Sequence, residues 1–428
     1  MAEGIIFLIM LAVFVFTAFA FNLPIGVCMM IASIAGALCD GQGIPLRHMF
    51  EGSFGYLSTI LVIASAMLFM KTIQKSGLLE TVARFIIDKF HNVKVLLLAG
   101  ITLLIMFPGM ITGSSTACVL TTGTLVVPVL MYFGVPKHKT GAIIAMAALY
   151  GMLAPPVNLP AMIIGAGIDM PYVGFFKPLL FATVPIAIIT SWILGLPHML
   201  KKKKEGQGEL DKSALPASYF KQYGIKIILP FVVLVVLMTL PSIFKGKFPD
   251  LGMPLVMLIS AAVAMVTGKE FNVLEAVREA VRDSVPVMSI LMGVGMFIQI
   301  MTLTGVRGFI VVNSLSLPQS WLLVAMAVSI PLFGAVSAFG SASVLGVPFL
   351  LTLSGSGNAI ILTTGITLLV SLGDLVPPTA LAGIFAAQVI DEPNYFKVLK
   401  YCIFPALLTI AAGLLIVAYS NPLSKWLL

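Results

Sequence analysis

Two short stretches decide the fold: residues 107–118 read FPGMITGSSTAC, and residues 149–160 read LYGMLAPPVNLP. Each lies inside a long apolar run. The first run is interrupted by the Gly-Ser-Ser-Thr tetrad at 113–116 and the second by Pro155 and Pro156. Glycine permits a tight turn, while two consecutive prolines remove two amide donors and stop a helix. Both stretches therefore predict helices that break in the middle of an apolar segment.

Composition indicates that lipid is the solvent for most of the chain. Hydrophobic residues make up 59% of the 428 residues and charged residues only 10%, a ratio unsuited to a water-facing globular domain. The formal charge of +8 comes from basic residues in short loops rather than on one amphipathic face, which argues against a nucleic-acid partner. Alternating strands typical of an outer-membrane barrel do not appear.

Hydropathy predicts ten crossings, because apolar segments of roughly 17 to 25 residues suffice to span a bilayer. They lie near residues 5–21, 24–39, 57–76, 140–170, 176–198, 224–243, 251–267, 285–304, 357–390 and 395–418, the fourth and ninth being interrupted. Apolar stretches at about 93–133 and 319–353, broken by Gly and Ser, are predicted to be re-entrant hairpins. The loops then obey the positive-inside rule if the N-terminus is periplasmic and each hairpin returns to the side it entered.

Landmarks in the first half recur in the second at offsets of 220 to 230 residues. Pro24 pairs with Pro254, Gly77 with Gly305, and the Pro-Pro dipeptide at 155–156 with that at 377–378. We therefore predict two repeats, residues 1–198 and 224–428, joined by a basic linker at 199–223. Each half has an odd number of crossings, so the second copy enters from the opposite face as an inverted repeat.

The hairpin tips are the first candidate site. The first contains Gly113, Ser114, Ser115 and Thr116, and its predicted counterpart contains Gly340, Ser341, Ala342 and Ser343. Irregular backbone is tolerated at membrane depth only where it is buried in protein or lines a wet cavity, and hydroxyl oxygens suit a small cation such as Na⁺. The alternative interpretation is that these small residues only let helices pack closely.

The broken helices are the second candidate site. A break leaves free carbonyls for a cation and exposed amides, with a positive dipole end, for an anion. Asn158 and Thr379 begin the half-helices and are placed to orient substrate oxygens. Two simple proline kinks would explain the bends, although not why each half pairs a break with a Gly-Ser hairpin.

Asp374 is an acidic residue three positions before the second break, with no Lys or Arg near it in sequence. Ionisable groups at that depth are rare, expensive and usually functional. The carboxylate is predicted to ligate a cation, carry a proton or cap the following half-helix. Since no basic residue lies in the proposed site, an anionic substrate would depend on amides, dipoles and bound cations.

Other chemistries find little support in the sequence. There is no Walker loop for a nucleotide and no Gly-x-Ser-x-Gly elbow, and the four histidines lie in loops or at span ends. An ion gradient is therefore the expected energy source, and neither enzymatic activity nor a cofactor is predicted. An ion channel, with the broken helices lining a continuous pore, remains an alternative.

At these residues the chain resembles the large membrane (M) subunit of the tripartite ATP-independent periplasmic (TRAP) transporters, within the ion-transporter superfamily. The resemblance covers nearly the whole chain and is closest over residues 107–165. It implies an all-α polytopic protein of the bacterial inner membrane, in which a transport domain moves against a scaffold as an elevator. It also implies Na⁺-coupled uptake of carboxylates such as C4-dicarboxylates or sialic acid, with a small four-helix membrane (Q) subunit and a periplasmic binding (P) protein.

The resemblance places cation sites at both tips and both breaks. Substrate contacts are predicted from Ser114, Ser115, Asn158, Ser341 and Thr379. Na⁺ ligands are predicted among Gly113, Ser115, Thr116, Pro155, Gly340, Ser343, Asp374 and Pro377. A stand-alone dimeric anion transporter of the same superfamily is the alternative within this class.

Overall fold

The computed structural model describes residues 2–201, 215–244 and 249–428, and within them every regular element is a helix. Eight of the described helices are long and apolar enough to cross a membrane. These observations confirm the predicted all-α polytopic class. Most of the basic linker predicted at 199–223 falls on residues 202–214, which lie outside the described residues.

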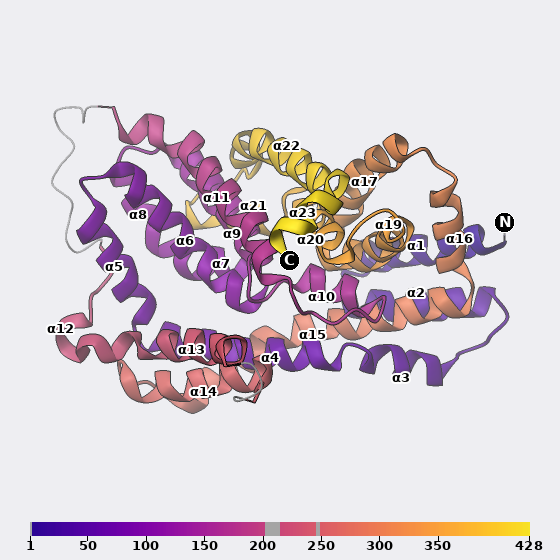
Figure 1. Ribbon diagram of the computed structural model, residues 1–428, viewed down its shortest axis with the longest axis horizontal. Helices are drawn as coiled ribbons and strands as arrows, with labels where there is room; N and C mark the ends of the chain where they lie inside the picture. The colour runs from indigo at the N-terminus through magenta and orange to yellow at the C-terminus, as the bar shows by residue number, and fades with distance from the viewer. Residues whose placement is uncertain (1, 202–214, 245–248) are drawn as a thin grey trace.

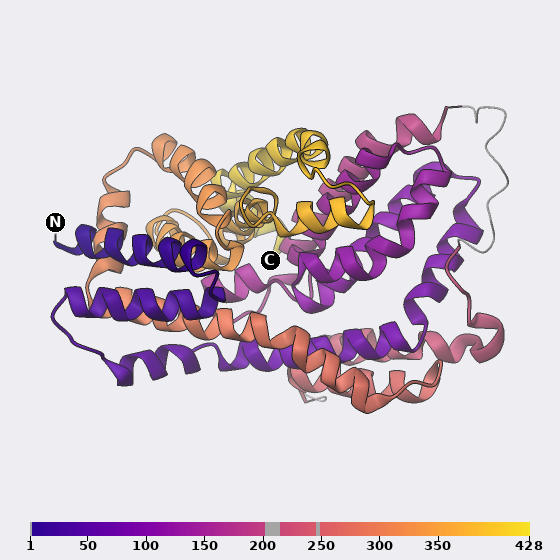
Figure 2. The same ribbon diagram turned by 180° about the vertical axis from the view of Figure 1, so that it is seen from behind.

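The helices form two layers (Figures 1 and 2). The lower layer in Figure 1 contains α2 (Ile25–Cys39), α3 (Leu46–Phe54), α4 (Leu57–Lys75), α13 (Leu229–Ile243), α14 (Gly252–Thr267) and α15 (Val273–Leu303). The long helix α15 packs along α2, α3 and α4. A Cβ on Gly295 would lie 2.0 Å from the Gly52 carbonyl oxygen, so backbones from the two halves of the sequence touch directly. Helix α1 (Ala2–Ala20) lies beside α2.

Helix α15 begins earlier than the predicted span at 285–304. Its first turns are charged and lie against the end of α4, where the Lys71 ammonium is 2.7 Å from Asp283 and the Lys75 ammonium is 2.7 Å from Glu279. Asn272 caps the helix by accepting a hydrogen bond from the Glu275 amide. Hydropathy missed these turns because they are stabilised by caps and ion pairs rather than by apolar burial.

The first hairpin belongs to the upper layer. It comprises α6 (Lys94–Thr112), α7 (Ser115–Cys118), the π-helical turn η1 (Val119–Gly123) and α8 (Thr124–Tyr132). The chain turns at Gly113, whose φ of +65° suits glycine, and Ser114 caps α7. At the open end, the Lys94 ammonium lies 4.0 Å from the centre of the Phe133 ring. The first and last residues of the hairpin therefore lie side by side.

The second hairpin turns at a different place from the one predicted. It comprises α17 (Gln319–Gly334), α18 (Ala338–Ser341), η4 (Ala342–Gly346) and α19 (Val347–Leu353), so the turn is at 335–337. The predicted tip at 340–343 is wrong: these residues are helical and lie in the second arm. Gly340 is closely packed, because a Cβ there would lie 3.0 Å from the terminal methyl group of the Met29 side chain. Ser337, which caps α18, is the counterpart of Ser114.

Both predicted helix breaks are present. Helix α9 (Lys137–Leu153) is separated from α10 (Leu159–Ala166) by the first Pro-Pro dipeptide. The second dipeptide separates α20 (Ala359–Ser371) and η5 (Leu372–Leu375) from α21 (Leu381–Val389), and both Pro-Pro bonds are cis. Each break is bonded to the hairpin of its own half, with the Val157 amide 3.1 Å from the Met110 carbonyl oxygen and the Thr379 amide 3.2 Å from that of Ala335.

Each hairpin also packs closely on the broken helix of its own half. A Cβ on Gly151 would lie 2.6 Å from the Met106 carbonyl oxygen, and a Cβ on Gly373 would lie 2.6 Å from the backbone of Gly334. Any larger residue at these glycines would push the hairpin away from the break. The same contact recurs in both halves of the chain.

Two connectors that hydropathy did not predict join the layers. Helix α5 (Leu78–Phe90) leads from α4 to the first hairpin, and α16 (Val306–Leu315) leads from α15 to the second. Each follows a glycine with positive φ, Gly77 at +80° and Gly305 at +71°. The remaining described helices are α11 (Phe176–Met199), α12 (Phe220–Tyr223), η3 (Gly224–Ile228), α22 (Phe396–Ala418) and α23 (Ser420–Leu427).

A cluster of charged residues joins the two halves at one end of the upper layer. Glu392, between α21 and α22, lies 2.9 Å from the Lys397 ammonium and 2.7 Å from Nε2 of His138 at the start of α9. Hydrogen bonds from Lys397 and His138 lower the pKa of Glu392 from 4.5 to about 2. The cluster therefore holds the start of one broken helix against the end of the other.

Glu392→Gln should lower the melting temperature at neutral pH. The folded-state pKa lies below the unfolded one, so the carboxylate stabilises the fold above the unfolded value of 4.5. That contribution is lost as pH falls through about 2. Thermal melts of purified protein from pH 7 downward should show the two proteins converging. The exposed Glu270→Gln is the control, and a constant difference at all pH values would contradict the ion-pair account.

Gly373→Ala should lower the free energy of unfolding by about 1–3 kcal/mol, the usual cost of overpacking a tight contact. The new Cβ would meet the Gly334 backbone. Gly308→Ala in α16 is the matched control, because nothing lies within 4 Å of a Cβ there. Equal thermal stability of the two variants would show that the hairpin and the break do not pack as described.

Candidate functional site

A cavity of about 170 Å³ lies where the two hairpin tips meet the second break. Its polar lining comes from Ser114, Ser115, Thr116, Ser337, Asp374 and Thr379. Its apolar lining includes Ile25 and Ile290, which belong to α2 and α15 of the lower layer. The cavity therefore lies between the layers, with hydroxyl and carboxylate oxygens on the upper side and hydrocarbon on the lower side.

Asp374 is the acidic residue of this cavity. It belongs to η5, its side chain is buried, and the Ser115 hydroxyl donates to its Oδ2. Ser115 lies at the tip of the first hairpin, so this hydrogen bond joins the hairpin of one half to the break of the other. Among the described residues that line the cavity, none is basic.

A buried carboxylate with one neutral hydrogen-bond partner is costly. Removing a charge from water requires several kcal/mol of compensation from paired charges or multiple hydrogen bonds. Ser115 is the one side chain among the described residues that bonds the Asp374 carboxylate. A cation or a proton at this carboxylate would supply the missing compensation.

The other cavity hydroxyls are positioned by the turns themselves. Thr379 donates from Oγ1 to the Ala335 carbonyl at 2.7 Å, and the Ser337 Oγ accepts from the Gly340 amide at 3.0 Å. Thr116, in the first turn of α7, also lines the cavity. Each hydroxyl keeps lone pairs that could face a ligand. These oxygens and Asp374 give the cavity the hard donors expected of a Na⁺ site.

Asn158 lies elsewhere. It is fully buried, and its amide group bridges the first break, with Oδ1 accepting from the Ala161 amide and Nδ2 donating to the Leu153 carbonyl, both at 2.9 Å. The residue thus satisfies one orphan group on each half-helix. Its side chain does not line the 170 Å³ cavity.

Several other predicted residues also lie outside this cavity. Pro155 lines a second cavity, of about 670 Å³, with Tyr172, Lys177 and residues of α13 and α14. Pro377 is exposed. Gly113, Gly340, Ser341 and Ser343 are buried around the hairpins. The hydroxyls of Ser341 and Ser343 bond carbonyls in their own turns.

Ser337 is a cavity residue that the sequence prediction missed. Its signal was a possible N-cap, a serine in an apolar segment three residues before Gly340, whose amide it bonds. Glycine drew attention to the tetrad at 340–343 instead. Both hairpins turn with a serine cap, and this shared feature aligns them better than the glycines do.

Comparison with known families identifies the chain. Residues 8–423 match the family described as "Tripartite ATP-independent periplasmic transporter, DctM component". The chain belongs to this family. The predicted resemblance to the large TRAP subunit over nearly the whole chain is therefore confirmed. This DctM-family chain is a multi-pass membrane component of a secondary transporter. The family is a class of transporters rather than of enzymes.

Two solved structures share the fold of this DctM-family chain. The YdaH transporter of Alcanivorax borkumensis matches with a TM-score of 0.62 at 17% identity, covering 87% of this chain and 88% of that one. MtrF of Neisseria gonorrhoeae, reported to illuminate a class of antimetabolite efflux pumps, matches with a TM-score of 0.59 at 15% identity, covering 87% and 83%. Such low identity shows the fold alone. A comparison with curated proteins finds no match.

Cysteine labelling should distinguish the real second tip from the predicted one. In a Cys39→Ser background, which removes the exposed native thiol, Ser337→Cys should react faster than Ser341→Cys with a small charged thiol reagent. Ser337 lines the cavity, whereas Ser341 is fully buried in α18. Faster labelling of Ser341→Cys would contradict a tip at 335–337 and support the tip predicted at 340–343.

Proposed function

We propose that this chain is the membrane permease of a Na⁺-coupled importer of small carboxylates, of the C4-dicarboxylate or sialic-acid type. The observation that carries the proposal is the buried Asp374 carboxylate, which meets hydroxyls from the first hairpin in a cavity whose described lining residues include no basic one. A monovalent cation would neutralise this carboxylate. In its absence, a second negative charge in the same cavity would be strongly disfavoured.

This charge balance supplies a reason for coupling. A carboxylate solute entering beside Asp374 would meet like charge and no Lys or Arg among the lining residues that the structure describes. Bound Na⁺ would reverse the sign of the local field, so solute and cation would favour each other's binding. We propose that Asp374, Ser115 and Thr116 hold the cation, and that Ser114 and Thr379 face the solute.

The remaining predicted residues take supporting roles in this proposal. Asn158 shapes the first break by bonding both of its half-helices. Gly113, Gly340, Ser341 and Ser343 let the hairpins turn and pack. Pro155 and Pro377 end the helices that lead to the site. We assign these roles because none of these residues lines the cavity that contains Asp374.

We further propose that the upper layer carries the solute past the lower layer in an elevator motion. The connectors α5 and α16 support this mechanism, because each follows a glycine in the left-handed region where a hinge costs little strain. The family is one component of a tripartite system. A small four-helix membrane (Q) subunit and a periplasmic substrate-binding (P) protein are therefore the proposed partners, with the N-terminus periplasmic in a bacterial inner membrane.

Asp374→Asn should reduce Na⁺-driven uptake by at least about tenfold, since a tenfold loss equals only about 1.4 kcal/mol and removing one partner of a buried charge pair, here the carboxylate and the bound cation, usually costs more. The assay is solute uptake by the complete three-component system in proteoliposomes, with membrane insertion checked separately. Asp391→Asn is the matched control, because Asp391 is exposed and its φ of +54° also suits asparagine.

Unchanged uptake by Asp374→Asn would remove this carboxylate from the mechanism. A flux that persists when choline replaces Na⁺ would contradict sodium coupling. Single-channel currents in planar bilayers would instead support the pore interpretation, in which the broken helices line a continuous pathway.

A further inference from the structure

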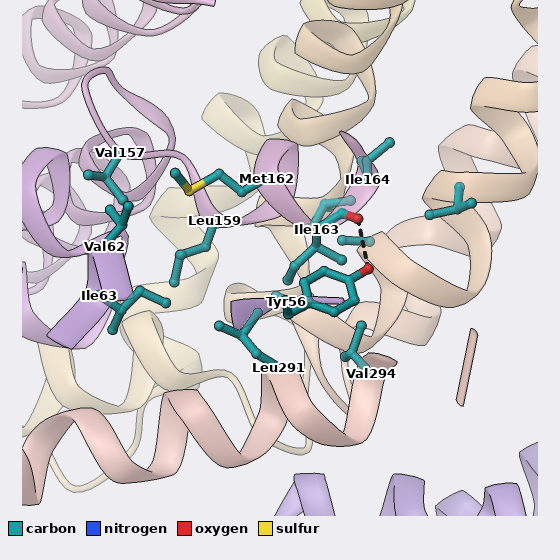
Figure 3. Packing of buried hydrophobic residues seen from close by; sticks show 14 of the residues in the cluster. Tyr56, Val62, Ile63, Val157, Leu159, Met162, Ile163, Ile164, Leu291 and Val294 are labelled. Atoms are coloured by element: carbon teal, nitrogen blue, oxygen red, sulfur yellow. Dashed lines mark hydrogen bonds between the residues drawn. The ribbon is translucent and has the colours of Figure 1, made fainter. Parts of the chain in front are cut away.

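Two side chains from outside the upper layer hydrogen-bond to helix α10. The Tyr56 hydroxyl, at the junction of α3 and α4, donates to the Ile163 carbonyl at 3.0 Å (Figure 3). The Arg307 guanidinium, in the first turn of α16, donates from Nη2 to the Gly167 carbonyl at 2.7 Å. Ile163 and Gly167 are four residues apart, so the two donors hold successive turns at the end of one half-helix.

Tyr56 is fixed by the lower layer. Its side chain is 3% exposed, and a Cβ on Gly295 would lie 3.0 Å from its ring. The ring therefore packs directly on the backbone of α15, beside Leu291 and Val294 in Figure 3. With the ring held in this way, the hydroxyl has one position relative to the lower layer.

Arg307 acts from the connector that leads to the second hairpin. It follows Gly305, which begins α16 in the left-handed conformation. Its guanidinium donates to the carbonyl of Gly167, the C-cap of α10, where helix carbonyls lack partners and carry partial negative charge. The contact therefore links the hinge of the second half to the broken helix of the first half.

The packing around these two hydrogen bonds is apolar. Leu159, Met162 and Ile163 of α10 share a buried cluster with Val62 and Ile63 of α4 (Figure 3). Apolar packing is non-directional, so a shift along α4 and α15 can exchange one apolar contact for another. Hydrogen bonds are directional and are lost within a shift of about 1 Å. The two bonds, rather than the apolar surface, thus fix the position of α10 along α4 and α15. We call this position the register of the upper layer.

The register of α10 is transmitted to the candidate site. Leu159 is the first residue of α10, and a Cβ on Gly113 would lie 2.5 Å from its side chain. The tip that presents Ser114, Ser115 and Thr116 therefore rests on the start of α10. A movement of α10 would therefore disturb the contact that supports that tip.

We propose that Tyr56 and Arg307 are positioning residues that latch α10 to the lower layer and to the connector α16, respectively, and set the balance between two registers of the upper layer. The proposal rests on the carrier function proposed above. Neither residue lines the 170 Å³ cavity. Their loss should therefore change the populations of the two registers and the turnover rate while leaving the cation affinity of each register unchanged.

The test is a distance measurement on the full-length chain in nanodiscs. Spin labels at Phe50→Cys on α3 and Phe396→Cys on α22, both exposed positions, report the offset of the two layers in a Cys39→Ser background. Tyr56→Phe removes one hydroxyl. The ratio of the two populations, each identified by its own label-to-label distance, should shift about 2- to 10-fold away from the register seen here, the range expected for a single hydrogen bond.

Tyr150→Phe is the matched control. Its hydroxyl is also buried but bonds Thr409 within the upper layer, so its loss should leave the ratio unchanged. Arg307→Gln should shift the ratio in the same direction as Tyr56→Phe, and Arg307→Lys should recover part of the effect because the ammonium can still donate to the Gly167 carbonyl.

A ratio that Tyr56→Phe and Arg307→Gln leave at the wild-type value, or a single distance in every variant, would overturn the latch. A ratio that Tyr150→Phe shifts equally would also overturn it, since the effect would then reflect general loosening. Na⁺-driven uptake by the wild-type system tests the carrier function separately, so the two proposals fail in different assays.

Discussion

Backbone that is not helical at membrane depth must find its hydrogen-bond partners inside the protein, because lipid offers none. The structure meets this requirement locally. Ser114 and Ser337 cap the second arms of the hairpins, and Asn158 bonds both sides of the first break. Each break is also bonded to the neighbouring hairpin, through Val157 in one half and Thr379 in the other. The hairpins and breaks are therefore mutually dependent, and where three of them meet they enclose a cavity.

The composition of that cavity determines what it can bind. Asp374 brings a negative charge to a place where the described lining residues bring no positive one, and among the described side chains only the hydroxyl of Ser115 bonds it. The wall that α2 and α15 contribute is apolar, with Ile25 and Ile290 lining the cavity. A site of this kind is incomplete without a cation, and a carboxylate solute would find it attractive only once the cation is bound. Coupling would then follow from charge balance rather than from a dedicated gate.

Prolines and one glycine made both helix breaks and the first hairpin turn predictable from the sequence. The breaks at 155–156 and 377–378 and the turn at Gly113 follow from residues that have few other uses inside an apolar helix. The second tip was misplaced because Gly340 and its neighbours fit equally well in a packed helix, whereas the actual turn at 335–337 contains neither Gly nor Pro. Asp374 stood out by its charge, but its partner Ser115 lies 259 residues away, a pairing that only tertiary structure can reveal. The connectors escaped notice because short amphipathic helices leave no long apolar run.

The central claim is that the cavity beside Asp374 is a cation site shared by elements of both halves. The most direct test is an experimental structure at high resolution in Na⁺ and again with choline in its place. Density for a cation between Asp374, Ser115 and Thr116 is expected in Na⁺ only. A cavity that stays empty in Na⁺ while the ion binds elsewhere in the chain would contradict it.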